Sequence, residues 1–121
     1  MLTISSAYRY YLYIKPADMR KNFDGLSGIV SNEFTQNPIS GDVFIFINRR
    51  RSQVKLLHWQ GDGFAIYYKR LEKGTYELPA VQQSSPVVKL KAQELLLIIE
   101  GISLLSVKKR PRYEQQIVWK C

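Results

Sequence analysis

The sequence predicts an α+β fold: an antiparallel β-meander of four to five strands, one amphipathic helix packed on it, and a second helix near the C-terminus. Residues 43–78 contain four short apolar runs rich in Val, Ile, Phe and Tyr, separated by turn residues. Residues 8–15 alternate with a period of two, which is typical of a strand. Apolar residues follow helical spacing between residues 18 and 34 and again between 91 and 102.

Length and composition predict one domain, residues 1–121, with a core over about 8–102 and a basic C-terminal segment, 103–121. The apolar fraction of 45% is too high for a disordered chain, and no apolar run approaches the ~20 residues of a membrane span. A net charge of +8 favours a polyanionic partner such as nucleic acid, although many basic domains bind none. The single cysteine, Cys121, permits no internal disulfide, and with no evident signal peptide we expect a cytoplasmic protein.

The predicted meander is built from four runs joined by three turns. Its strands are Val43–Ile47, Val54–Trp59, Phe64–Tyr68 and a short Thr75–Leu78. The second and third turns, Gly61-Asp62-Gly63 and Lys73-Gly74, hold glycines that tolerate positive φ. The first turn is Arg49-Arg50-Arg51, whose like charges repel and whose residue type is poor in turns. These arginines therefore indicate a role other than turn formation.

A strand and a helix are predicted before the meander. The strand runs from Tyr8 to Lys15 and ends at Pro16, because proline donates no ladder hydrogen bond. The helix runs from Ala17 or Asp18 to Phe34, with Asp18 as the candidate N-cap. Its apolar stripe should pack against the sheet.

The sequence after the meander predicts a further strand and a second helix. Val87–Leu90 is a candidate short strand, and Lys91–Ile102 is predicted to be a strongly apolar helix that Gly101 could cap. Ile117–Trp119 could add a final strand. The basic block Lys108–Arg112 is interpreted as a solvated tail in preference to a phosphate site.

Two further basic pairs accompany the arginine turn. Lys69-Arg70 lies at the far end of the third strand of the meander. Because this strand is antiparallel to the second, its far end should lie beside Arg51. Arg20 and Lys21 lie in the first turn of the predicted helix, where cations are disfavoured by the helix dipole. Pairing of both residues with Asp24 at helical spacing is slightly favoured over a phosphate site that they would form with the helix N-terminus.

Three blocks of the sequence resemble a known bacterial family. They are Asp18–Leu26, Ser40–Phe44 with Arg49–Arg51, and Trp59–Gly74, in the family's order and at similar spacing. The family is the small accessory protein encoded beside the transposase in insertion sequences of the sixty-six type. The resemblance implies a role in transposition, with transposon DNA and the transposase as partners, and carries no defined biochemical activity. The sequence departs from the family pattern at Asn48, His58 and Gln60.

No residue pattern predicts catalysis. The candidate carboxylates all have local structural explanations: Asp18, Asp24, Asp42 and Asp62. A Cys121–His58 nucleophile would need a terminal cysteine to be held rigidly. Paired zinc ligands and a glycine-rich phosphate loop are lacking. We therefore predict a protein that is not an enzyme and has no metal, cofactor, small-molecule substrate or membrane partner.

Two classes of function remain open, with RNA binding a third. In the first, the protein binds transposon DNA through seven basic residues: Arg49, Arg50, Arg51, Lys69, Arg70, Arg20 and Lys21. In the second, it is an adaptor that binds the transposase without contacting DNA, and its charge serves solubility. Tyr67, Tyr68 and Trp59 could stack on bases, but aromatic residues in strands more often belong to the core.

Overall fold

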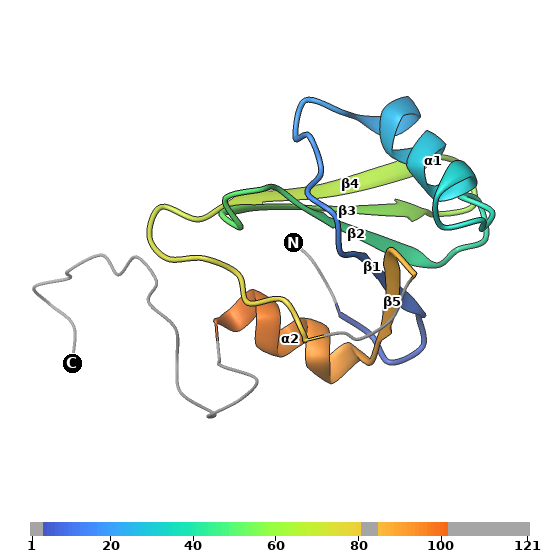
Figure 1. The fold of residues 1–121 in the computed structure, drawn as a ribbon. Helices are drawn as coiled ribbons and strands as arrows, with labels where there is room; N and C mark the ends of the chain where they lie inside the picture. Colours follow the sequence, from blue (N-terminus) through green and yellow to red (C-terminus); the bar gives the residue numbers. More distant parts are fainter. Residues whose placement is uncertain (1–3, 81–84, 102–121) are drawn as a thin grey trace, which may run out of the picture.

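A five-stranded sheet lies between two helices in the computed structural model, which describes residues 4–80 and 85–101 (Figure 1). The strand order is β4-β3-β2-β1-β5, with α1 on one face of the sheet and α2 on the other. In chain order the elements are β1 (Tyr10–Tyr13), α1 (Phe23–Asn32), β2 (Val43–Ile47), β3 (Gln53–Trp59), β4 (Phe64–Arg70), β5 (Val87–Leu90) and α2 (Ala92–Glu100). The α+β class is therefore confirmed.

The sheet is mixed, so the prediction of a wholly antiparallel sheet is wrong. Strands β2, β3 and β4 do form two antiparallel hairpins, and β5 is antiparallel to β1. However, β1 and β2 are parallel, with Tyr10 opposite Val43 and Leu12 opposite Ile45. The reason is that α1 carries the chain back across one face of the sheet, and a strand–helix–strand crossover returns the chain in its original direction.

The predicted strand at Thr75–Leu78 is also wrong. This stretch follows β4 and crosses to the α2 face of the sheet, where Tyr76 is fully buried in the core. The Tyr76 backbone N–H donates to the Arg51 carbonyl at 2.7 Å, outside any strand ladder. The apolar residues of this stretch pack against the face of the sheet. A buried stretch of this kind has the same apolar sequence pattern as a short strand.

Helix α1 begins at Phe23 and ends at Asn32, inside the predicted range. Asp18 is not its N-cap, because its carboxylate accepts a hydrogen bond from the Arg20 backbone N–H (2.9 Å) and forms a local turn before the helix. Helix α2 lies within the predicted range and ends as predicted. Gly101 adopts φ +80° and donates its N–H to the carbonyl of Leu97 at 3.0 Å.

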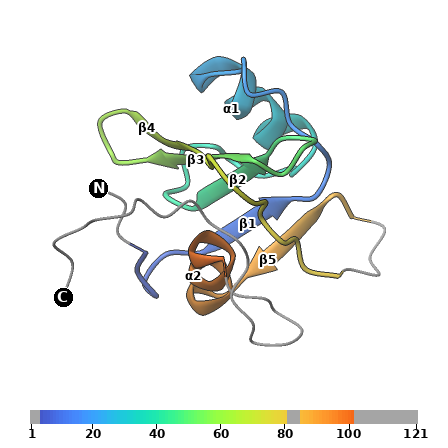
Figure 2. The same ribbon diagram turned by 90° about the vertical axis from the view of Figure 1, so that its left-hand side faces the viewer.

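Each face of the sheet has its own apolar core, and each core lies beneath one of the two helices that Figure 2 shows on opposite faces of the sheet. On one face, α2 packs Leu95, Ile98 and Ile99 against the sheet. On the other, α1 packs Leu26 and Val30 beside the aromatic residues Tyr13, Phe34, Phe44 and Phe46. Every residue of β2 is buried, which explains its unbroken apolar sequence.

The basic block Lys108–Arg112 and the predicted strand Ile117–Trp119 lie outside the described residues. Within the described part of the chain, no helix has the length and apolar character needed to cross a membrane.

Candidate nucleic-acid interface

The β2–β3 turn holds the three arginines and is organised by Asn48. The Asn48 side-chain oxygen accepts hydrogen bonds from the backbone N–H groups of Ser52 (2.8 Å) and Gln53 (3.0 Å). The Arg51 N–H donates to the Asn48 carbonyl at 3.0 Å. The turn is therefore closed by Asn48 and the backbone, and all three arginine side chains remain exposed. In the sequence, Asn48 was marked only by its departure from the family pattern.

Arg51 occupies the left-handed backbone region, with φ +57°. Glycine and asparagine adopt this conformation most readily, and it costs other residues roughly 1–2 kcal/mol. Among the described residues, Thr35 is the other non-glycine residue with positive φ. Local conformational preference thus opposes arginine at this position.

The end of β4 lies beside the arginine turn. In the antiparallel register of β3 and β4, Arg70 lies opposite Gln53 and Lys69 lies opposite Val54. The Leu71 N–H donates a hydrogen bond to the Ser52 carbonyl at 2.7 Å. Side chains alternate along a strand, so Arg70 lies on the α1 face and Lys69 on the α2 face, both exposed. The β3–β4 turn lies at the other end of the sheet.

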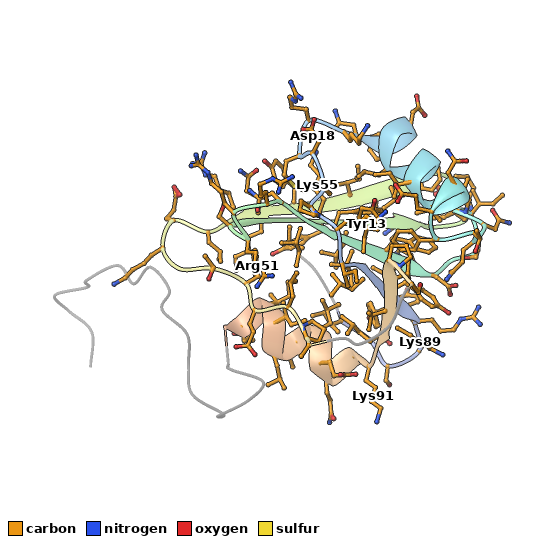
Figure 3. The ribbon with its side chains drawn as sticks, in the orientation of Figure 1. Tyr13, Asp18, Arg51, Lys55, Lys89 and Lys91 are labelled. Atoms are coloured by element: carbon orange, nitrogen blue, oxygen red, sulfur yellow. The ribbon has the colours of Figure 1, made fainter. Side chains whose placement is uncertain are left out.

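A buried lysine brings the Arg20–Lys21 segment to the same end of the sheet. Lys55, in β3, is 3% exposed and lies on the α1 face. Its ammonium donates to the carbonyls of Met19 and Lys21, both at 2.8 Å, and to the Asn22 side-chain oxygen at 3.0 Å. Figure 3 shows Lys55 directly below the loop that carries Asp18 and toward the same end of the sheet as Arg51.

Sequence reasoning missed Lys55, although a signal was present. It is a lone lysine within a strand whose neighbours are apolar, and an unpaired ammonium would not be stable there. The tyrosine opposite it, Tyr68, covers the ammonium at 4.7 Å from the ring centroid.

Arg20 pairs with Asp18 at 2.7 Å, so the predicted pairing of Arg20 with Asp24 is wrong. The physical reason is that Arg20 and Lys21 precede α1 and therefore lack the helical spacing to Asp24. Hydrogen bonds from Arg20 lower the pKa of the exposed Asp18 carboxyl to about 2. Arg70 forms an exposed ion pair with Glu72 at 3.2 Å.

We call the seven predicted residues the basic end: Arg49, Arg50, Arg51, Lys69, Arg70, Arg20 and Lys21. They come from three segments of the chain and gather around one end of β2, β3 and β4. Within residues 4–80 and 85–101, ion pairs engage two of the seven, Arg20 and Arg70. The remaining positive charge faces solvent.

Three of the residues considered for catalysis have structural contacts: Asp18, whose ion pair with Arg20 is described above, Asp42 and His58. Asp42 is buried and accepts a hydrogen bond from the Arg9 guanidinium at 2.9 Å. The His58 ring lies 3.1 Å from the Gly41 carbonyl and makes an edge contact with Tyr8. Over the described ranges, no group of three or more His, Cys, Asp or Glu side chains could hold a metal ion. Cys121 lies outside those ranges, and the absence of catalysis stays a prediction.

A second surface feature lies at the other end of the sheet. A hollow of about 420 Å³ opens on the α2 face, over β3 and β4. It is lined mainly by aromatic and apolar side chains, including Tyr8, Tyr10, Leu56, His58 and Tyr67. This hollow is separate from the basic end.

Comparison with known proteins identifies one family and two relatives. Residues 8–109 match a family model described as IS66 Orf2 like protein. The uncharacterized protein y4jC of Sinorhizobium fredii is 27% identical over 111 residues, covering 92% of this chain and 93% of that protein. The uncharacterized protein y4hO of the same organism is 26% identical over 102 residues, covering 84% of this chain and 87% of that protein. No solved structure matches the chain.

Proposed function

Because this chain belongs to the IS66 Orf2-like family, accessory proteins of insertion-sequence transposition, we propose that it binds transposon DNA through its basic end. The observation that carries the proposal is the convergence of three basic segments on one end of the sheet. A single basic loop is often only a solvated surface. A surface assembled from residues 20–21, 49–51 and 69–70 requires a specific tertiary arrangement.

Arginine in the β2–β3 turn further supports this proposal. The positive φ of Arg51 is unfavourable for this residue type, so its presence there points to a use for the side chain. A guanidinium offers five donors in a planar fork and binds phosphate through paired hydrogen bonds. The turn projects these groups where they need no desolvation by the core.

The proposed binding mode is contact with the phosphate backbone. Phosphate contacts position a protein on DNA and make affinity strongly dependent on salt. Each phosphate contact contributes a slope of about −0.9 to the plot of log affinity against log salt. Sequence preference would have to come from other contacts.

The test compares two variants that lose the same charge. Arg49→Gln/Arg50→Gln removes two charges from the turn and leaves the strained Arg51 in place. Lys89→Gln/Lys91→Gln removes two charges from β5 and the start of α2, far from Arg51 in Figure 3. Affinity for duplex DNA from the transposon ends is measured at several salt concentrations, after a thermal melt has verified folding.

The turn variant should bind more weakly, and its salt slope should be smaller in magnitude by up to about 1.8, which is 0.9 for each of two contacts. The β5–α2 variant should keep the wild-type slope. Equal behaviour of the two variants would show that net charge alone explains the binding and would refute a specific role for the turn.

Binding to the transposase without DNA contact is the second candidate function, and the hollow on the α2 face favours it. Tyr8 lines the hollow and is exposed, and aromatic residues are frequent anchors at protein interfaces. Co-purification with the transposase of the same element tests this function. Loss of co-purification in Tyr8→Ser, together with no measurable DNA affinity of the wild-type protein, would establish it.

A further inference from the structure

An exposed aromatic side chain lies beside the basic end. Tyr68, in β4, is 51% exposed. It lies two residues before Arg70, on the same face of the strand. Most large apolar side chains of this sheet are buried, so an open tyrosine among cations is a candidate contact residue.

The Tyr68 ring is held in place by two contacts. The Lys55 ammonium lies over the ring, 4.7 Å from its centroid. The Tyr68 hydroxyl donates to the side-chain oxygen of Gln53, its diagonal neighbour on β3. A ring fixed at both its face and its hydroxyl loses little conformational entropy when a ligand binds.

These contacts also decide which surface of the ring is available. The ammonium occupies one face, so a flat ligand can stack only on the other. Arg70, two residues further along β4 and on the same face of the strand, is exposed and placed to bind a negative group that flanks such a ligand. Lys21, whose backbone carbonyl accepts a hydrogen bond from Lys55, is exposed as well.

We propose that Tyr68 is a stacking platform for an unpaired base of single-stranded DNA, whose flanking phosphates bind the basic end. This inference rests on the proposed DNA-binding function and narrows its substrate. Combining a positively charged surface with an aromatic ring is how proteins bind single strands without regard to sequence. A base in an intact duplex already stacks on both faces and cannot use the ring in this way.

The experiment measures the affinity of Tyr68→Leu, Tyr68→Phe and Tyr68→Trp for a single-stranded oligonucleotide and for its duplex. Tyr8→Leu is the control, because Tyr8 is similarly exposed at the other end of the sheet. Tyr68→Leu should lower single-strand affinity about five- to a hundredfold, while duplex affinity and the salt slope stay near wild type. Tyr68→Phe should bind like wild type and Tyr68→Trp at least as tightly.

A second measurement remains valid if Tyr68→Leu fails to fold. The wild-type protein is irradiated with a single strand that contains bromodeoxyuridine, and the cross-linked peptide is identified by mass spectrometry. We expect the cross-link at Tyr68. A cross-link confined to other residues would overturn the proposal.

The outcomes separate this inference from the proposed function. Failure of the wild-type protein to bind either form of DNA would refute both. Wild-type binding of both forms, with single-strand affinity equal in Tyr68→Leu and Tyr68→Phe, would refute the stacking role alone. Equal losses for single strand and duplex in Tyr68→Leu would also refute it, because stacking requires an unpaired base.

Discussion

Replacing Lys55 with methionine removes the ammonium that fastens the Met19–Asn22 segment to the sheet. Methionine has a similar length and is apolar, so it fills the space between β3 and that segment without restoring a donor. Three hydrogen bonds from a charged group are lost, at 2.8, 2.8 and 3.0 Å. The two carbonyl oxygens and the Asn22 side chain must then find water or remain unsatisfied.

The size of the effect follows from two opposing terms. A hydrogen bond to a charged group contributes about 1.5–3 kcal/mol net, and three such bonds would sum to more if they were independent. Against this, a buried ammonium carries a desolvation cost of several kcal/mol, which methionine avoids. Lys21 and Asn22 are exposed residues, so water can reach part of the vacated acceptors. We expect a net loss of about 2 kcal/mol in the free energy of unfolding.

Urea unfolding at pH 7, followed by circular dichroism, measures this loss. The midpoint should fall with little change in the m-value, and Tm should drop by roughly 6–10 °C. Amide exchange should quicken at Lys21 and Leu26, whose N–H groups donate to the carbonyls of Asp18 and Asn22. Lys89→Met is the matched control, because Lys89 is an exposed strand lysine whose replacement should change stability by less than about 0.5 kcal/mol.

A loss in Lys55→Met no larger than that in Lys89→Met would refute this account. It would mean that the desolvation cost of the ammonium cancels its hydrogen bonds, and that packing alone holds the segment on the sheet. Faster exchange confined to α2 would refute it as well, since Lys55 faces α1.

Two further predictions concern the turn and the core. Arg51→Gly should raise the free energy of unfolding by about 1 kcal/mol, because glycine adopts φ +57° without strain. The same change should weaken DNA binding. A lower free energy of unfolding, measured with urea, would contradict this prediction. The second concerns Tyr13, where burial and, secondarily, the Glu33 carboxylate raise the pKa of the hydroxyl to about 12. The neutral hydroxyl contributes its full stabilisation below the ordinary pKa of tyrosine, near 10, and this stabilisation is lost as the pH rises toward 12. The free energy of unfolding of the wild type, relative to that of Tyr13→Phe, should therefore fall by roughly 2–3 kcal/mol between pH 9 and 12. A constant difference in unfolding free energy across that range would contradict it.

The local periods in the sequence predicted most of the secondary structure. The Val43–Ile47 strand and the Gly101 cap lie where their residue types place them. The antiparallel return of Lys69–Arg70 toward the arginine turn also follows from sequence, because short turns join β2, β3 and β4 and leave one way to pair them. Two of the three segments of the basic end are therefore brought together by the sequence pattern alone.

The tertiary structure decided the contacts between distant segments. Local patterns cannot specify which strand lies beside β1, because that choice depends on the crossover through α1 and on the return of β5 after a long connection. The position of Arg20 and Lys21 was unpredictable for the same reason, since it depends on the ammonium of Lys55, more than thirty residues away in sequence. A period in the sequence shows which face of an element is buried, whereas the element that covers it is selected by packing over the whole chain.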